Sequence, residues 1–464
     1  MKRKTRGWYG HRVAVVVWVL TTFWAVGLVA QDAGAPMDES EFRDWGSQFA
    51  GVYAFPSGRH AVIVPHTQFR VLSLFELETG MARPLEREDT DSFTYGPNVV
   101  SVSPTEGRLT FFRDVNGEIE RVRWEQRTGS TSGRRLPLRR EAVRFRNGER
   151  AHLSGWLITP PTDGPHPVAV ILQPGANDRF KLWRTAMALA VEGIGVLVFD
   201  RRNVGESTGV ELTDHHWSAT QELAGDGAAA VRFARSHPRV DGQRVGVVGW
   251  SQGGWMGALV ANRIPDLAFY VNIAGNSNPG WQQNRWNKLS SLRWEGFSEE
   301  EVSEAEAFLE THFGVMLGEA AWEVYQDAVA ELAERPWFTW MEETFRYLWS
   351  SEAEAREYAE LERDNVPERD FAVVSAPTLG LFFEFDESSP PETPRIFLRG
   401  RMRGDDPDVT VRVFPNTTHE AFVVNEFPTA AAQGGITRLA PQVFRELRSW
   451  VADRVANGDQ RHFR

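Results

Sequence analysis

The sequence contains no cysteine among its 464 residues. Disulfides, thiolate metal sites, a cysteine nucleophile and a cysteine-linked lipid anchor are therefore excluded. An excess of positive charge is also missing, since the formal net charge is −12, and general nucleic-acid binding needs clustered positive charge. After residue 30 no apolar run approaches the length that spans a bilayer, which excludes a polytopic membrane protein.

The composition is that of a globular protein. Hydrophobic residues make up 42% and charged residues 25% of the chain, so a sizeable core can be buried. At about 150 residues per domain, the length indicates about three domains or one large domain with additions. Aromatic residues are abundant, with 18 tryptophans and 29 phenylalanines, and their positions bear on function.

Residues 1–30 resemble an export signal. Basic residues from Lys2 to Arg12 precede an uncharged, mostly apolar run from Val13 to Ala30. This order is typical of a signal peptide, and the run is also just long enough to serve as a membrane anchor. We therefore expect an exported protein, periplasmic or extracellular, either released by cleavage or tethered to the membrane through residues 13–30.

Residues 31–138 read as a small all-β domain. Short apolar strands alternate with turns, and Asn116-Gly117 is a strong signal for a tight hairpin. Between Glu41 and Arg127 no helical apolar period is evident, so no helix is expected there. The Gly/Ser/Arg-rich stretch from Arg127 to Arg140 is predicted to be a linker.

Residues 139–464 have a different pattern. After a hairpin through Asn147-Gly148, near-continuous apolar strands alternate with helices, which predicts a mostly parallel sheet covered by helices on both faces. Residues 276–365 interrupt this alternation, because they contain no obvious strand. We predict that they form a helical insertion, and it holds seven tryptophans: Trp281, Trp286, Trp294, Trp322, Trp337, Trp340 and Trp349.

A candidate nucleophile follows one of the predicted strands. The strand Val245 to Val248 leads into Gly249-Trp250-Ser251-Gln252-Gly253, a G-x-S-x-G sequence between a strand and a helix. Such a sharp turn lifts the serine hydroxyl off the sheet edge. The main-chain N–H of Gln252, at the start of the helix, would face a developing oxyanion. The alternative is a glycine-rich turn without chemistry.

A serine nucleophile needs a base and an acid. In folds with a serine on such a strand-to-helix turn, the acid and then the histidine come after the serine along the chain. His419 lies just past the last predicted strand, whereas His462 is in the terminal tail and His312 is inside the insertion. The acid should follow the strand from Pro377 to Phe383, where both Asp386 and Glu384 stand.

These motifs together resemble one branch of a large family. The nucleophile turn, the stretch Asp200 to Gly209 and the acid loop Phe385 to Pro391 are similar to motifs of the dienelactone hydrolase and prolyl-oligopeptidase-like branch of the α/β-hydrolases. The resemblance covers about two thirds of the chain and implies an α/β-hydrolase fold. It also implies Asp386 as the acid. The family's His-Gly after the third strand is absent here.

The second oxyanion donor is left open by this departure. The loop that replaces His-Gly begins at Gln173, and either Gly175 or Ala176 offers a main-chain N–H. Gln173 itself has a structural interpretation or a substrate-binding one. The same choice holds for Arg202, and the insertion's tryptophans either pack within the helices or line an apolar acyl pocket above Ser251.

The sequence therefore predicts an exported serine hydrolase. Ser251 attacks an acyl carbon, His419 is the general base and Asp386 orients it, with no metal or organic cofactor required. The expected partner is a small-molecule acyl substrate, with carboxylic esters first and peptides or amides second. A non-catalytic envelope-binding protein on a hydrolase fold is the alternative from another class. The oligomeric state is not indicated.

Overall fold

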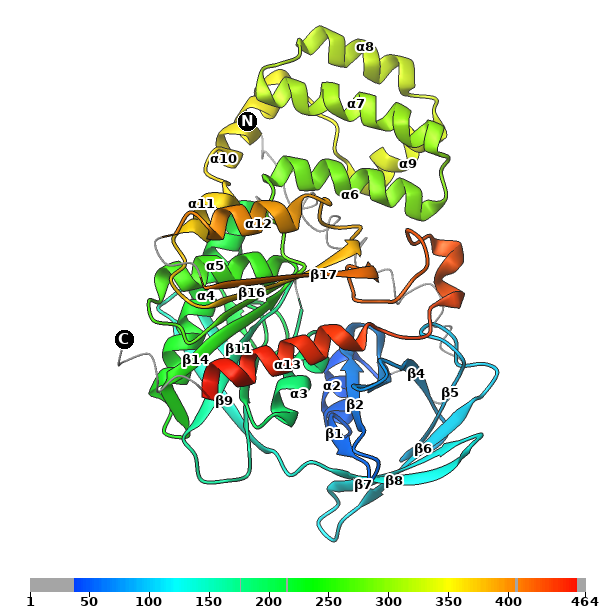
Figure 1. The fold of residues 1–464 in the computed structure, drawn as a ribbon. Helices are drawn as coiled ribbons and strands as arrows, with labels where there is room; N and C mark the ends of the chain where they lie inside the picture. The colour runs from blue at the N-terminus through cyan, green and yellow to red at the C-terminus, as the bar shows by residue number, and fades with distance from the viewer. Residues whose placement is uncertain (1–36, 176, 214–215, 405–407, 457–464) are drawn as a thin grey trace, which may run out of the picture.

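The computed structural model describes residues 37–175, 177–213, 216–404 and 408–456. Two β structures dominate it: a closed barrel near the N-terminus and a nine-stranded open sheet. A group of helices stands over one end of the sheet, as Figure 1 shows. Within the described residues, no helix is long and apolar enough to cross a membrane. The expected signal or anchor in residues 1–30 lies outside them.

The barrel is antiparallel and closes by pairing its first strand with its last. Its interior is packed with aromatic and aliphatic side chains, among them Trp124, Phe93 and Phe111. The strands are β1 Gly51–Ala54, β2 His60–His66, β3 Val71–Glu76, β4 Ala82–Arg87, β5 Ser92–Tyr95, β6 Gly107–Arg113, β7 Ile119–Gln126 and β8 Gly129–Arg135.

Two expectations for this region are wrong. The stretch from Arg127 to Arg140 is not a linker, because β8 lies within it and pairs with both β7 and β1. A helix, α2 Glu39–Ser47, begins this region, and a single turn, η2 Thr67–Phe69, follows β2. The Asp38 and Glu41 side chains cap α2 reciprocally, and Phe42 buries its ring in the barrel core. Such a short helix offers too few apolar residues for a visible period.

The open sheet has the order β13-β10-β12-β11-β14-β15-β16-β17, with β9 paired to β10. Pairs from β12 through β17 are parallel, and those made by β10 are antiparallel. The bounds are β9 Arg139–Asn147, β10 Ala151–Thr159, β11 His166–Leu172, β12 Gly195–Phe199, β13 Thr208–Gly209, β14 Val240–Trp250, β15 Tyr270–Ile273, β16 Thr378–Phe385 and β17 Val409–Thr418.

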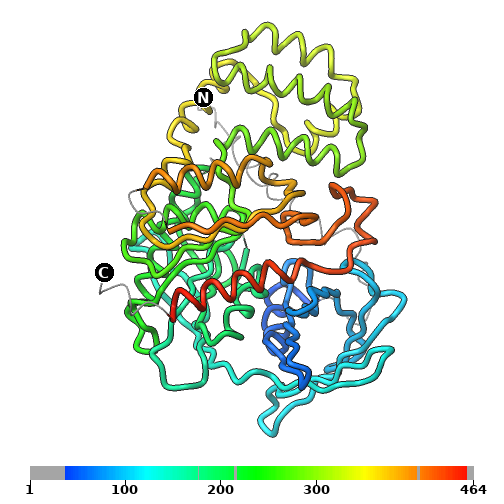
Figure 2. Tube along the Cα trace, in the orientation of Figure 1, coloured from blue at the N-terminus to red at the C-terminus, as the bar shows by residue number. Residues whose placement is uncertain are grey.

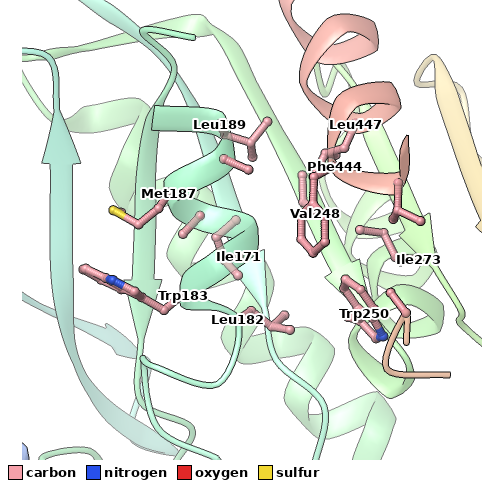
Figure 3. Close-up of a cluster of buried hydrophobic side chains, with 14 of the residues drawn as sticks. Ile171, Leu182, Trp183, Met187, Leu189, Val248, Trp250, Ile273, Phe444 and Leu447 are labelled. Carbon is pink, nitrogen blue, oxygen red and sulfur yellow. The ribbon is translucent and has the colours of Figure 1, made fainter. Parts of the chain in front are cut away.

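Helices cover both faces of this sheet. On one face, α3 Trp183–Val191 and α13 Pro441–Ala456 pack over Ile171 and Val248, as Figure 3 shows. The outer side of the barrel joins the same core, with the Phe75 and Phe444 ring centroids 4.8 Å apart. The other face carries α4 His216–Ser236, α5 Gln252–Arg263 and α12 Thr393–Arg401. The expected α/β-hydrolase architecture is therefore present.

Six helices separate β15 from β16. The first five share an apolar core of their own, rich in aromatic rings, whereas Phe371 of the sixth packs into the core of the sheet. The chain trace in Figure 2 leaves the sheet and returns to it through these helices. Their bounds are α6 Gly280–Glu295, α7 Glu299–Leu317, α8 Trp322–Leu332, α9 Pro336–Phe345, α10 Glu352–Glu362 and α11 Pro367–Ala372. A short 3₁₀ helix, η3 Ala430–Gly435, precedes α13.

Candidate active site

Ser251 occupies a strained turn between β14 and α5. Its φ of 55° and ψ of −125° are unusual for a residue with a side chain. The turn is tight enough to need glycine on both sides. A Cβ on Gly249 would lie 2.0 Å from the carbonyl oxygen of Gly253, and one on Gly253 would lie 2.0 Å from that of Leu172. The strain presents the Ser251 side chain at the sheet edge, where it is partly exposed.

His419 and Asp386 form a buried pair. His419 follows β17, Asp386 follows β16, and their Nδ1 and Oδ1 atoms are 2.9 Å apart. The same Asp386 oxygen accepts hydrogen bonds from the main-chain N–H groups of Ser388 and Ser389, at 2.8 and 2.7 Å. These donors fix the carboxylate in the orientation that meets the imidazole.

Glu384 has a different role in the structure. Its exposed carboxylate accepts the main-chain N–H of Asn416 at 2.8 Å and links the ends of β16 and β17. Of the two acids considered from the sequence, the one that contacts His419 is therefore Asp386.

The serine turn and the histidine loop are joined directly. The indole N–H of Trp250, the residue before Ser251, donates to the carbonyl oxygen of His419 at 3.0 Å. Parallel strands end at one edge of the sheet, so β14, β16 and β17 bring all three side chains there. No hydrogen bond joins the Ser251 hydroxyl to His419 among the described residues, as is common before a substrate binds.

Three carboxylates surround His419. Burial alone would lower the pKa of this imidazole, but Asp386, Glu387 and Glu420 raise it to about 9. Glu387 accepts the main-chain N–H of His419 at 3.1 Å. Glu420 bonds Lys181 at 3.4 Å and lies 3.9 Å from Arg184. Sequence reasoning missed Glu387 and Glu420. The only signal was their position beside residues already chosen.

The candidate oxyanion loop is tied to the nucleophile turn. Gln252 is the first residue of α5, and its side-chain oxygen accepts the main-chain N–H of Gly175 at 3.2 Å. Arg201 donates to the same oxygen at 3.0 Å and also to the carbonyl of Gly175. Ala176, the other candidate donor, lies outside the described residues. Gln173 donates its side-chain amide to the carbonyl of Phe199 at 2.6 Å, a contact within the protein.

The charged residues after β12 hold loops together. Asp200 is fully buried and accepts hydrogen bonds from the Arg179 guanidinium at 2.6 and 3.0 Å. Arg202 has a fully buried side chain and pairs with Asp226 at 2.7 Å. The alternative in which Arg202 contacts substrate is therefore not what the structure shows.

The insertion's tryptophans divide between packing and the site. Trp286 of α6 donates its indole N–H to the carbonyl oxygen of Asp386 at 3.0 Å. Trp294, also of α6, belongs to the apolar cluster that includes Trp250. The rest belong to the helices' own core: Trp281, Trp322, Trp337, Trp340 and Trp349. Packing thus accounts for most of them, and α6 alone of these helices reaches the acid through a tryptophan.

Comparisons with known proteins agree with this architecture. Residues 174–433, more than half of the chain, match the model of the alpha/beta hydrolase family. A thiohydrolase of Arthrinium phaeospermum is 28% identical over 135 residues, which are 29% of this chain and 42% of that protein. A proposed carboxymethylenebutenolidase of Synechocystis is 26% identical over 147 residues, which are 29% of this chain and 58% of that protein. The chain thus covers less than two thirds of either relative.

Solved structures include similar chains at low identity. An esterase of Pyrococcus furiosus is 17% identical, with a TM-score of 0.42, over 70% of this chain and 92% of that one. A proline iminopeptidase of Mycobacterium smegmatis is 20% identical, with a TM-score of 0.40, over 69% of this chain and 99% of that one. The family is shown by the match over residues 174–433, and the chain belongs to the alpha/beta hydrolase family.

Proposed function

We propose that the protein is an exported serine hydrolase that cleaves a carboxylic ester of a small molecule. The observation that carries the proposal is the buried His419–Asp386 pair at 2.9 Å, joined through Trp250 to the strained Ser251 turn. A nucleophile, a base and an orienting acid at one sheet edge are the parts that acyl transfer needs.

The reaction would run in two acyl-transfer steps. The Ser251 hydroxyl oxygen attacks the carbonyl carbon while its proton passes to Nε2 of His419, and Asp386 stabilises the resulting imidazolium through Nδ1. The tetrahedral oxyanion would be held by the main-chain N–H of Gln252 and by a second main-chain N–H. Ala176 is one candidate for the second donor, and Gly175 would serve only by releasing the Gln252 side-chain oxygen that its N–H contacts at 3.2 Å. The imidazolium then protonates the leaving alkoxide. Water, deprotonated by His419, attacks the acyl-enzyme and restores Ser251.

Esters are the favoured substrate class for two reasons. The names of the curated relatives describe a thiohydrolase and a lactone-type hydrolase, both of which act on ester-like acyl bonds. On the α6 side of the site, the Trp286 ring stands edge-on to Phe427, with the centroids 6.5 Å apart. Such rings suit an apolar acyl or alcohol group.

The remaining parts of the chain have proposed roles around this site. We propose that α6–α11, within and just beyond the expected insertion 276–365, act as a cap over the sheet edge. The barrel would form a β domain within 31–138 that packs against the hydrolase domain through their shared apolar core. Residues 1–30 would direct export and, if retained, tether the enzyme to a membrane. No metal or organic cofactor enters the mechanism.

A substrate panel tests the substrate class. The purified enzyme would be assayed with p-nitrophenyl esters of increasing acyl length, an acyl thioester and aminoacyl anilides, before and after reaction with a fluorophosphonate probe. We expect ester turnover that the probe abolishes. Faster turnover of anilides would replace the ester proposal with an amidase, and probe-insensitive turnover would refute the serine mechanism.

A further inference from the structure

Two glutamates, one at the end of β16 and one in the acid loop, make similar contacts with the end of β17 and with the residue that follows it. Glu384 accepts the main-chain N–H of Asn416 at 2.8 Å, and Glu387 accepts that of His419 at 3.1 Å. In each pair the partners are 32 residues apart, so the segment that leaves β16 runs beside the segment that leaves β17 through both contacts. The environments differ, because Glu384 is exposed and Glu387 is only 6% exposed.

Glu387 has few hydrogen-bond partners for a buried carboxylate. Its Oε2 atom takes the His419 N–H, but Oε1 is buried and has no hydrogen-bond partner in the described part of the chain. An ionised carboxylate in such a position is costly unless a positive charge lies near. Burial raises the pKa of Glu387 to about 7, with His419 opposing the rise and Asp386 adding to it.

Few charged groups lie around His419 and Glu387. Facing His419 are Asp386 and Glu387 from the acid loop and Glu420 from its own loop. Burial would raise the pKa of Glu420, but Lys181, His419 and Arg184 together hold it below its ordinary value. Glu420 thus has two further cations beside it, Lys181 and Arg184. Among the groups in the described residues that shift the pKa of Glu387, His419 is the one cation.

We propose that Glu387 is a positioning residue of the hydrolase, which holds the main chain of His419 in place and sets the pH at which this histidine becomes a free base. The inference rests on the proposed function. The contact with the His419 N–H fixes the loop that presents the imidazole to Asp386. The negative charge favours the imidazolium, so it delays the appearance of the neutral base as pH rises.

The two roles predict different effects for two variants. Glu387→Gln retains an oxygen that can accept the His419 N–H but removes the charge. The acid limb is the range of pH over which kcat/KM rises as His419 loses its proton. We expect the acid limb of this variant to move about one pH unit lower, as loss of a nearby charge commonly causes. Its plateau kcat/KM should stay within about threefold of wild type. Glu387→Leu also removes the acceptor and leaves a buried N–H unpaired, so its plateau kcat should fall at least about tenfold, with KM changed less than about threefold.

Glu384→Gln is the matched control. It changes the same residue type three positions earlier, at the end of β16, with the same kind of main-chain contact but at an exposed position away from the His419–Asp386 pair. Its acid limb should coincide with that of wild type. The full pH dependence of kcat/KM would be measured for all four proteins with one ester, after active-site titration with the fluorophosphonate probe.

The outcomes separate this inference from the proposed function. An acid limb in Glu387→Gln that coincides with wild type overturns the electrostatic role, and an unchanged plateau kcat in Glu387→Leu overturns the positioning role. An equal shift in Glu384→Gln would also overturn the inference, because exposed charge would then suffice. If Ser251 is not labelled and no ester is turned over, the failure lies with the proposed function instead.

Discussion

The sheet edge and the helical segment α6–α10 differ in the kinds of side chain that they bury. At the edge, a strained serine and several buried charged groups meet within a few residues of the strand ends. The helical segment is held by an aromatic core that includes Trp337, Phe308 and Tyr325. Strain and buried charge at the sheet edge lower the stability of the fold, and the proposed chemistry explains why they are there. The aromatic core of α6–α10 raises stability and has no proposed part in the chemistry. Substitutions at the edge should therefore affect turnover, and those in the helical core should affect folding.

The largest effect is expected for Ser251→Ala. Removal of the hydroxyl removes the proposed nucleophile, so kcat should fall at least about 10⁴-fold and fluorophosphonate labelling should disappear. The fold should persist, because Ser251 is partly exposed and belongs to none of the apolar clusters of the described residues. Thermal unfolding followed by circular dichroism checks the second point. Labelling at the wild-type level would show that another residue is the nucleophile.

Asp386→Asn should have the next largest effect. The amide keeps the shape but removes the charge and can stabilise the wrong histidine tautomer, which in the general triad scheme costs about 10⁴-fold in turnover. We expect a loss of at least about 10²-fold in kcat, against less than about tenfold for Glu384→Gln. Steady-state kinetics with a p-nitrophenyl ester measure both, and the reverse ranking would transfer the role of acid to Glu384.

The pH dependence of the wild-type enzyme tests the charges at the edge. His419 must be neutral to act as the proposed base, and the carboxylates around it raise its pKa to about 9 against the effect of burial. In the free enzyme kcat/KM should therefore rise about tenfold per pH unit up to about pH 9 and then level off. A plateau already reached at pH 7 would contradict this balance of charges.

The same shift has a consequence for stability. The folded pKa of His419 lies above its ordinary value of 6.5, so the folded state binds this proton more tightly than the unfolded chain does. The stabilisation is fully present below about pH 6.5 and is lost as pH rises to about 9. Activity and this contribution to stability should therefore change in opposite directions over the same pH window, which urea unfolding at several pH values would show.

Trp337→Ala tests the helical segment in isolation. This fully buried ring lies in the helices' own core and donates to Glu304 at 2.6 Å. Its loss should cost about 3–5 kcal/mol of folding free energy, seen as earlier cleavage of α6–α10 in limited proteolysis. Ser251 labelling should remain within about threefold of wild type. Trp183→Ala, in the core beside the sheet, is the comparison, and it should reduce labelling as well.

The site residues that could be predicted from the sequence are those that follow recognisable strands. Ser251, Asp386 and His419 each follow a strand whose apolar run is visible, so their meeting at one edge follows from parallel pairing. Glu387 and Trp286 could not be found this way. The contact of Glu387 depends on the register of two loops, and that of Trp286 on the placement of α6 over the acid loop.

For the fold, the alternation of strands and helices predicted the open sheet correctly. Local composition gave a wrong prediction for β8. Glycine, serine and arginine in β8 favour a linker, yet closure of the barrel between β7 and β1 imposes a strand on them. The helix α12 also escaped notice, because its nine residues have apolar side chains at only a few positions.

The smallest effect concerns the one tryptophan of α6 that contacts the acid. Trp286 donates its indole N–H to the carbonyl oxygen of Asp386 at 3.0 Å, so Trp286→Phe removes one hydrogen bond and retains most of the ring. A single hydrogen bond contributes about 0.5–1.5 kcal/mol, which corresponds to about a twofold to tenfold loss in kcat if the bond positions the acid. Steady-state kinetics on a probe-titrated enzyme would resolve this range.

Trp349→Phe is the matched control for that change. Trp349 makes the same kind of bond at the same distance, 3.0 Å, to the carbonyl of His312, but does so inside the helical core. It should lower the melting temperature by an amount similar to or larger than Trp286→Phe and leave kcat unchanged. If both variants lower kcat equally, the helical segment acts on the sheet edge as one packed unit. A loss confined to Trp286→Phe would instead locate the link in the single contact between α6 and the Asp386 carbonyl.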